Sequence, residues 1–250
     1  MPYQKVEAGA GWQWIAQGWS LFTQSAGNWI VIALIFGILY FVLNFVPFIG
    51  GLIATLLTPA LLGGMIYGAR ELDQGRSLEI AHLFQAFRES GRAGPMILLG
   101  LLPLIAAMIS GALAVALFAG AAGTGMMTGS EDAAMGMMAG GGLAVLGIAI
   151  LIGLVVGALL LFAVPRVMFA AAEPITALKE SLQAVLGNIG AYIVFAVVYI
   201  VLAIIATIPF GLGFLVLIPV VAGAVYSANK QVFGEEAGAP AGNEPTEATQ

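Results

Sequence analysis

The chain contains no cysteine and only one histidine, His82, among its 250 residues. The absence of cysteine excludes disulfides, thiolate metal ligands and cysteine nucleophiles. A single imidazole makes a poor metal site, because binding a metal takes several converging ligands. We therefore interpret His82 as a partly exposed residue at the membrane interface.

Charged residues are scarce as well. They make up 8% of the chain, against about 25% in typical soluble proteins, while apolar residues make up 61%. The runs 30–45 and 143–164 are apolar on both faces, which disfavours the alternating pattern of a transmembrane β-strand. The composition predicts an all-α integral membrane protein.

Six uncharged runs are long enough to cross a hydrocarbon core of about 30 Å, which takes about 20 helical residues. The connections between them include two short breaks and three long segments, at 70–94, 120–140 and 165–188. The predicted spanning helices cover residues 29–46, 50–69, 95–119, 141–164, 189–208 and 211–229.

Most of the net charge of −5 comes from the end of the chain, where Glu235, Glu236, Glu244 and Glu247 lie. The rest is close to neutral and lacks the broad basic surface that nucleic-acid binding requires. We predict a single polytopic membrane domain over 1–233. Residues 234–250, rich in Gly, Ala, Pro, Glu and Thr, are predicted to be a disordered cytoplasmic tail.

Lys and Arg predict the orientation, because membrane segments insert with their positive flanks in the cytoplasm. With six crossings, both termini and the loops 70–94 and 165–188 share one side. That side carries every basic residue: Lys5, Arg70, Arg76, Arg88, Arg92, Arg166, Lys179 and Lys230. We expect a multi-pass protein of the bacterial inner membrane with both termini in the cytoplasm.

Three segments on the same side show an apolar stripe at helical spacing, which predicts amphipathic helices lying at the membrane interface. The first, within 8–27, is rich in tryptophan, which favours the headgroup region. The alternative is that this helix packs on the bundle, and the two interpretations are compatible. The stripes are Trp12, Ile15, Trp19 and Phe22, then Ile80, Leu83, Phe84 and Phe87, and finally Leu178, Leu182 and Val185 after a start at Pro174.

A hairpin unit occurs twice. A Pro-Phe break, Val46–Gly51 in the first copy and Ile208–Gly213 in the second, separates two spanning helices. The sequence predicts a parallel repeat over 8–69 and 174–229, each copy being an amphipathic helix followed by a hairpin. The small residues in 64–69 and 223–228 predict close helix packing.

Candidate chemistry is sparse. The chain has no Gly-rich phosphate loop and no His-Glu-x-x-His helix, and no ionisable residue lies inside the predicted spans away from their ends. We predict no enzymatic activity, no cofactor, and no catalytic, cofactor-binding or metal site. Structural roles are expected for the polar groups inside the spans, which are Asn44, Thr55, Thr58, Ser110, Thr207, Tyr192 and Tyr199.

A group of methionines lies among Gly and Ala in 120–142. We interpret this segment as a flexible connector whose Met and Ala residues extend the adjoining helices. The alternative hypothesis is weak Cu(I) binding by thioether sulfur. The residues concerned are Met126, Met127, Met135, Met137 and Met138.

Several aromatic motifs resemble an uncharacterised family of small multi-pass inner-membrane proteins of Gram-negative bacteria. They are Gly11–Ile15, Gly18–Phe22, Asn28–Ile30, Leu72–Gly75 and His82–Phe87. This resemblance covers the first 90 residues best and implies localisation and fold, with no activity to carry over.

Two functions follow as hypotheses. The first is a non-enzymatic membrane protein that serves as a scaffold or accessory subunit. The second is a small channel or facilitator for an uncharged or lipid-like solute. The lipid bilayer is the one predicted partner; homo-oligomerisation and protein partners are left open.

Overall fold

The computed structural model describes residues 3–47 and 49–234, and every regular element in these ranges is helical. The predicted tail therefore lies outside the described residues from Glu235 on, as does Phe48 of the first break. The elements are α1 (Ala10–Gln24), α2 (Ala26–Asn44), α3 (Gly50–Asp73), the 3₁₀ helix η1 (Ile80–Phe84), α4 (Gln85–Arg88), α5 (Ala93–Leu99), α6 (Leu101–Thr128), α7 (Glu131–Ala170), α8 (Pro174–Gly187), α9 (Ile189–Thr207) and α10 (Phe214–Phe233).

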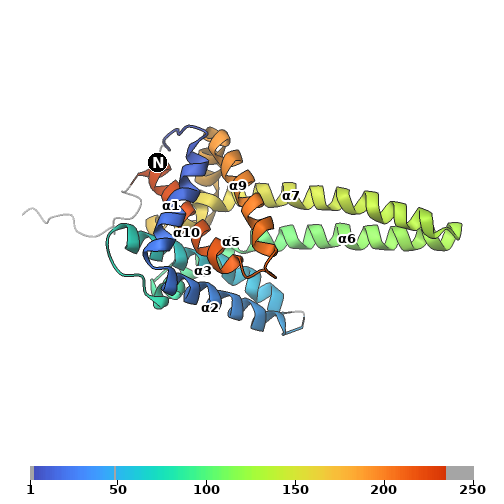
Figure 1. Cartoon of the computed structure of the whole chain (residues 1–250), viewed down its shortest axis with the longest axis horizontal. Helices are drawn as coiled ribbons and strands as arrows, with labels where there is room; N and C mark the ends of the chain where they lie inside the picture. The colour runs from blue at the N-terminus through green and yellow to red at the C-terminus, as the bar shows by residue number, and fades with distance from the viewer. Residues whose placement is uncertain (1–2, 48, 235–250) are drawn as a thin grey trace, which may run out of the picture.

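Within the described ranges, six helical segments are long and apolar enough to cross a membrane, as the sequence predicted. They form three hairpins, α2–α3, α5/α6–α7 and α9–α10 (Figure 1). The segments are Ala26–Asn44, Gly50–Asp73, Ala93–Thr128, Glu131–Ala170, Ile189–Thr207 and Phe214–Phe233.

The predicted connection at 120–140 is wrong, because this segment is almost entirely helical. Only Gly129 and Ser130 separate α6 from α7. Gly129 adopts a left-handed conformation, with φ of 62°, and Ser130 caps α7 by accepting a hydrogen bond from the Ala133 N–H at 3.1 Å. Because Ala and Met are strong helix formers, the flanking residues extend both helices, in line with the interpretation given above for the methionines.

The connection predicted at 165–188 begins at Pro165, and this predicted end of the preceding helix is also wrong. The proline lies inside α7, and only residues 171–173 separate α7 from α8. Near it the buried Ser181 hydroxyl accepts from the Phe162 N–H at 3.1 Å and donates to the Ala158 carbonyl at 2.8 Å. The hydroxyl thus bridges two α7 backbone groups, and α8 does begin at Pro174 as predicted.

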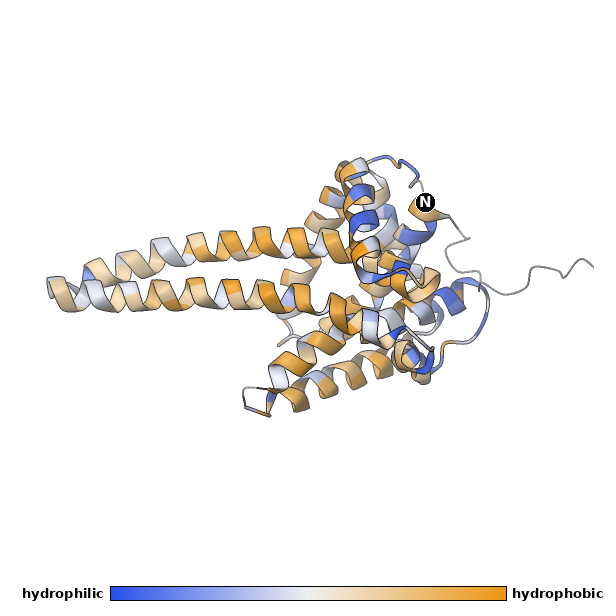
Figure 2. Cartoon of the chain, turned by 180° about the vertical axis from the view of Figure 1, so that it is seen from behind, coloured by the Kyte–Doolittle hydropathy of each residue, from blue (hydrophilic) through white to orange (hydrophobic). Residues whose placement is uncertain are grey.

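The hairpin of α6 and α7, called the arm from here on, projects alone from the rest of the protein (Figure 1; Figure 2). At 1.5 Å per residue, the 40 residues of α7 span about 60 Å and the 24 of α3 about 36 Å. None of the most apolar stretch of Ala93–Thr128 is buried. The arm therefore exposes apolar surface over most of its length.

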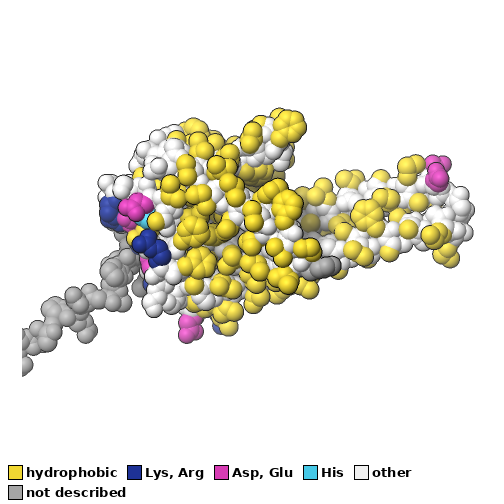
Figure 3. All heavy atoms as spheres, turned by 90° about the horizontal axis from the view of Figure 1, so that it is seen from below, with side chains coloured by type: hydrophobic (Ala, Val, Ile, Leu, Met, Phe, Trp, Pro, Cys, Tyr) yellow, Lys and Arg dark blue, Asp and Glu magenta, His cyan; other side chains and the backbone are white. Residues whose placement is uncertain are grey.

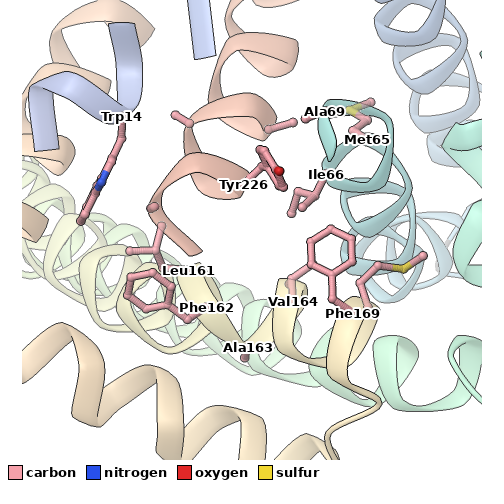
Figure 4. Close-up of a cluster of buried hydrophobic side chains, with 14 of the residues drawn as sticks. Trp14, Met65, Ile66, Ala69, Leu161, Phe162, Ala163, Val164, Phe169 and Tyr226 are labelled. Atoms are coloured by element: carbon pink, nitrogen blue, oxygen red, sulfur yellow. The ribbon is translucent and has the colours of Figure 1, made fainter. Parts of the chain in front are cut away.

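A central core joins the second helices of the three hairpins. Trp14 of α1 meets Phe162 edge to face, with ring centroids 6.5 Å apart, and α3, α7 and α10 contact one another. Figure 4 shows side chains from these four helices converging, among them Trp14, Met65, Ile66, Ala69, Leu161, Phe162, Ala163, Val164, Phe169 and Tyr226.

Each amphipathic segment packs on the hairpin that precedes its own. The η1/α4 segment packs on α3, and α8 packs on α7. The first segment, α1, packs on the last hairpin, α9–α10, far more than on α2 or α3. The structure therefore adds a third unit, η1/α4 with the arm, to the two predicted from sequence, and α1 closes the three units into a ring.

Two asparagines from the predicted repeat fasten this arrangement. Asn28, at the start of α2, donates to the Leu78 carbonyl at 2.8 Å, just before η1. Asn188, just before α9, accepts from the Val6 N–H at 2.7 Å and donates to the Gln4 carbonyl at 3.1 Å, just before α1. Asn28, on the first hairpin, thus binds the chain just before η1, which packs on that hairpin. Asn188, on the last hairpin, binds the chain just before α1, which packs there.

Candidate functional site at the polar end of the bundle

The predicted packing seams are confirmed as places of close approach. A Cβ on Gly64 would overlap the backbone carbonyls of His82 and Leu83. A Cβ on Gly223 would lie 3.0 Å from the Gly18 Cα, and one on Gly18 would overlap the Val220 carbonyl. Glycine at these positions lets η1 approach α3 and lets α1 approach α10, as small residues do between membrane helices.

Beyond these seams, the second helix of each hairpin carries a cation near its C-terminal end. Arg70 and Lys230 lie three residues before the last residues of α3 and α10, and Arg166 lies four before the end of α7. Positive charge is favourable there, because the carbonyl ends of helices carry partial negative charge. Figure 3 shows charged side chains gathered at this end of the molecule.

Arg166 is the most buried of the three, with 4% of its surface exposed. Its Nε donates to Glu180 Oε2 of α8 at 2.7 Å, and its guanidinium carbon lies 5.0 Å from the centre of the Phe233 ring. Its Nη1 is buried and has no hydrogen-bond partner among the described residues. A guanidinium in this position is held by one carboxylate and one aromatic face.

Arg70 and Lys230 occupy related positions. The guanidinium of Arg70 lies 4.6 Å from the Tyr67 ring and 4.4 Å from the Phe169 ring. Lys230 Nζ lies 2.8 Å from Asp73 Oδ2, which also accepts from the Tyr226 hydroxyl at 2.7 Å. These contacts connect α3 to α7 and α10 to α3.

The three contacts follow one cyclic rule. Each cation touches the residue three positions beyond the cation of the next helix: Arg70 meets Phe169, Arg166 meets Phe233, and Lys230 meets Asp73. Residues three apart lie on the same face of a helix, so one face of each helix carries both a cation and the partner for the cation of another helix. We call this set the cation ring.

Sequence reasoning used these cations only to orient the chain and missed the cation ring. The sequence feature that could have indicated the cation ring is a spacing of three residues. In the second helix of each hairpin, the cation near the C-terminal end is followed three residues later by an aromatic or acidic residue. The pairs are Arg70 and Asp73, Arg166 and Phe169, and Lys230 and Phe233.

A polar hollow of about 620 Å³ lies beside the cation ring, between α1 and α10. Amide and hydroxyl groups, together with the Asp73–Lys230 pair, supply its hydrogen-bonding groups. Within residues 3–47 and 49–234, no group of three or more His, Cys, Asp or Glu side chains could hold a metal ion. The lining comprises Gln4, Gln17, Ser20, Leu21, Gln24, Asp73, Ser227, Lys230, Gln231 and Gly234.

His82 is more buried than predicted, with 9% of its surface exposed. Its Nδ1 accepts from the Glu79 N–H at 3.2 Å, and its ring meets Tyr67 with centroids 5.3 Å apart. The expectation of a partly exposed residue is wrong because η1 presses this side chain against α3. Its partners give it a structural role at the start of η1.

The burial of His82 predicts a pH dependence. Burial lowers the pKa of His82 below its ordinary value of 6.5, although Glu71 and Glu79 act in the opposite direction. Its neutral form is therefore favoured by folding, and this contribution is fully present above pH 6.5 and is lost as pH falls through the folded-state pKa. We expect hydrogen exchange of η1 to accelerate as the pH is lowered below about 6.5, after correction for intrinsic exchange. In His82→Asn the corrected exchange should not change between pH 7 and pH 5.5; an equal change in both proteins would contradict this role.

Most polar groups inside the apolar helices bond to backbone carbonyls, as expected. Asn44, Thr55, Thr58 and Thr207 each donate to a carbonyl three or four residues earlier in their own helix. The Tyr192 hydroxyl donates across to the Leu154 carbonyl of α7.

The five methionines lie near the tip of the arm and are exposed, Met126 and Met127 by 87% and 90%. The Thr124 hydroxyl lies 3.4 Å from Met137 Sδ. The Cu(I) alternative stays a hypothesis.

Over the residues that the structure describes, these features define an all-helical fold with six long apolar helices arranged as three linked hairpins. The chain belongs to a family of unknown function (DUF7544), whose model matches residues 76–238. That match covers the arm and the last hairpin, whereas the resemblance noted from sequence covers mainly the first 90 residues. Neither the curated proteins nor the solved structures gave a match.

Proposed function

We propose that this protein is a non-enzymatic integral protein of the bacterial inner membrane that acts as a scaffold or accessory subunit, with the arm as its docking element. The observation that carries the proposal is the arm itself. It extends about 24 Å further than α3 at 1.5 Å per residue and buries almost none of α6 except against α7. Exposed apolar surface of this extent needs lipid or a partner to cover it.

The charge distribution supports the orientation. All eight basic residues belong to the end where the helices of the cation ring finish, whereas the tip of the arm carries only Glu131 and Asp132. Acidic side chains are seen at the far end of the arm in Figure 3. This asymmetry favours a cytoplasmic polar end and an arm that points out of the cytoplasm.

The orientation predicts the behaviour of reporter fusions. A fluorescent protein fused after Gln250 should fold and fluoresce, whereas a phosphatase that is active only outside the cytoplasm should be active when inserted at Gly129 and inactive after Gln250. If the fluorescent protein fused after Gln250 does not fluoresce and the phosphatase fused there is active, the predicted orientation is wrong.

The alternative, a channel or facilitator, has less support. A polar path would be expected near Asn44, Thr55 or Tyr199, and none of these lines the polar hollow. Thr55 bonds to the Gly51 carbonyl of its own helix at 2.8 Å, and the centre of the bundle is filled by aromatic and aliphatic side chains.

Shortening the arm tests the scaffold function. Residues 119–125 and 133–139 lie opposite each other, as shown by the approach of Gly120 to Met137 and of Gly125 to Ala134. Deleting both segments removes about two turns from each helix and keeps the turn at Gly129. We expect proteins that co-purify with the full chain from native membranes to be lost from this variant.

A matched control removes residues 235–250 and leaves the arm intact. It should retain the same co-purifying proteins. If the shortened arm keeps all of them, or if the full chain brings down none above background, the arm is not a docking element.

A further inference from the structure

A second hollow, of about 620 Å³, lies between α1 and the outer part of the α9–α10 hairpin. It is called the α1–α9–α10 groove here. Its volume is within the range of about 300–1,000 Å³ that is typical of sites for one small molecule. Its lining is Trp12, Ile15, Ala16, Trp19, Leu202, Ile205, Ala206, Ile208, Pro209, Gly213, Val216, Leu217 and Val220.

The lining carries no charged side chain, and its side-chain polar groups are the indole N–H groups of Trp12 and Trp19. These two tryptophans are 58% and 52% exposed, whereas Trp14 and Trp29 are almost completely buried. The indoles lie on α1, and the α9–α10 hairpin contributes only aliphatic residues, a glycine and a proline. The groove is therefore apolar except along the α1 side, where the two indole N–H groups lie.

The helix α1 separates two different environments. Its residues Ile15 and Trp19 face the α1–α9–α10 groove, whereas Gln17 and Gln24 face the polar hollow. A helix of this kind lies at the level where lipid headgroups meet acyl chains, with tryptophan at the boundary. The groove then opens toward the hydrocarbon, beneath α1.

We infer that the α1–α9–α10 groove binds an acyl chain of a membrane phospholipid from the leaflet on the α1 side. An extended peptide is a poor occupant, because its backbone N–H and C=O groups would meet no partner in this lining. An acyl chain has no such groups and places its polar end at the tryptophan edge. The inference rests on the membrane insertion proposed above and is independent of docking by the arm.

The four tryptophans provide the test. Purified full-length protein in a maltoside detergent is titrated with a phosphatidylcholine whose acyl chains carry bromine, a contact quencher of indole fluorescence. We expect saturable quenching of about half of the emission, because Trp12 and Trp19 line the groove while Trp14 and Trp29 are buried. Trp12→Phe with Trp19→Phe should remove the saturable phase.

A matched pair of variants separates groove binding from general contact with lipid. Ala16→Phe fills the groove from an exposed position of α1 and should weaken the saturable phase about tenfold. Val197→Phe places the same aromatic ring at an exposed site of α9 outside the groove and should leave the saturable phase unchanged. Quenching that never saturates, or that is the same in both variants, would overturn the inference.

Failure of membrane insertion would look different. A tryptophan placed at Val197 in the Trp12→Phe, Trp19→Phe protein reports contact with bilayer lipid without the groove. In bilayer discs made with the brominated lipid this reporter should be quenched. If the reporter is quenched but the titration shows no saturable quenching, the groove assignment is wrong and membrane insertion stands. If the reporter is not quenched, both membrane insertion and the groove assignment are wrong.

Discussion

Replacing Arg166 by Gln will lower the free energy of unfolding by about 3 kcal/mol, the cost of breaking a largely buried ion pair. The substitution removes the 2.7 Å contact with Glu180 and the stacking on Phe233. Glu180 then keeps its charge at a position where its side chain is only 17% exposed. The unfolding free energy, measured in lipid bicelles by steric trapping, gives the loss directly.

A double variant tests whether the loss comes from the Glu180 carboxylate that no longer faces a guanidinium. Arg166→Met with Glu180→Leu removes both partners and should recover most of the stability, because well-packed apolar residues often replace buried ion pairs without loss. A double variant that is less stable than Arg166→Gln would mean that the cation itself, through Phe233 or the end of α7, carries the stabilisation.

Adding one methyl group at Gly18 will have an effect of similar size. In Gly18→Ala the new Cβ would overlap the Val220 carbonyl, so α1 must move away from α10. Overpacking of this kind costs about 1–3 kcal/mol, and here the upper value is expected because backbone cannot move aside as a side chain can. Limited proteolysis of the N-terminal segment should accelerate together with the loss of stability.

Gly27→Ala is the matched control. Gly27 lies in α2 and a Cβ there would meet nothing within 4 Å, so this variant should be at least as stable as the wild type. Equal destabilisation by the two substitutions would show that helix propensity, and not the α1–α10 contact, determines the outcome.

The helices were predictable because their apolar runs are longer than any run expected in an exposed connection. The end of each run was harder to place. Composition alone assigned Gly129 and its Gly-, Ala- and Met-rich neighbours to one long connection, although a single left-handed glycine followed by the Ser130 cap is enough to reverse the chain. Composition identifies an apolar segment, whereas the capping residues determine where its helix ends.

The ring of three units could not be predicted, because it depends on which hairpin each amphipathic segment packs against. The stripe of Leu178, Leu182 and Val185 indicates that α8 has an apolar face, yet Leu182 is 40% exposed. The residues of α8 that are buried are Ala177, Ser181, Ala184 and Val185, so the stripe did not indicate which face packs on α7. The third unit was obscured because its amphipathic segment is divided into η1 and α4, and its hairpin is far longer than the others.

The position of Arg166 shows the same limit at the candidate site. A cation next to Pro165 looks like the start of a cytoplasmic loop, and its charge alone places it outside the membrane. Only the continuation of α7 beyond the proline brings Arg166 against α8 and α10. Burial of a charge is a property of the assembled fold, since it needs both Glu180 and Phe233 to be in place.

The central claim is that α1 closes the ring by packing on the last hairpin of its own chain. Because the chain has no native cysteine, a pair introduced as Gln17→Cys and Gln231→Cys can be bridged cleanly by a short bismaleimide. Both positions line the polar hollow, on α1 and α10. A second pair, Gln17→Cys with Asn44→Cys at the far end of α2, serves as the control.

The measurement is the mass of the bridged product in native membranes. We predict efficient bridging of Gln17→Cys to Gln231→Cys at the mass of one chain, with the N- and C-terminal fragments remaining joined after cleavage between them. The control pair should not bridge. A product at the mass of two chains, or bridging only in the control pair, would contradict closure of the ring by α1 within one molecule.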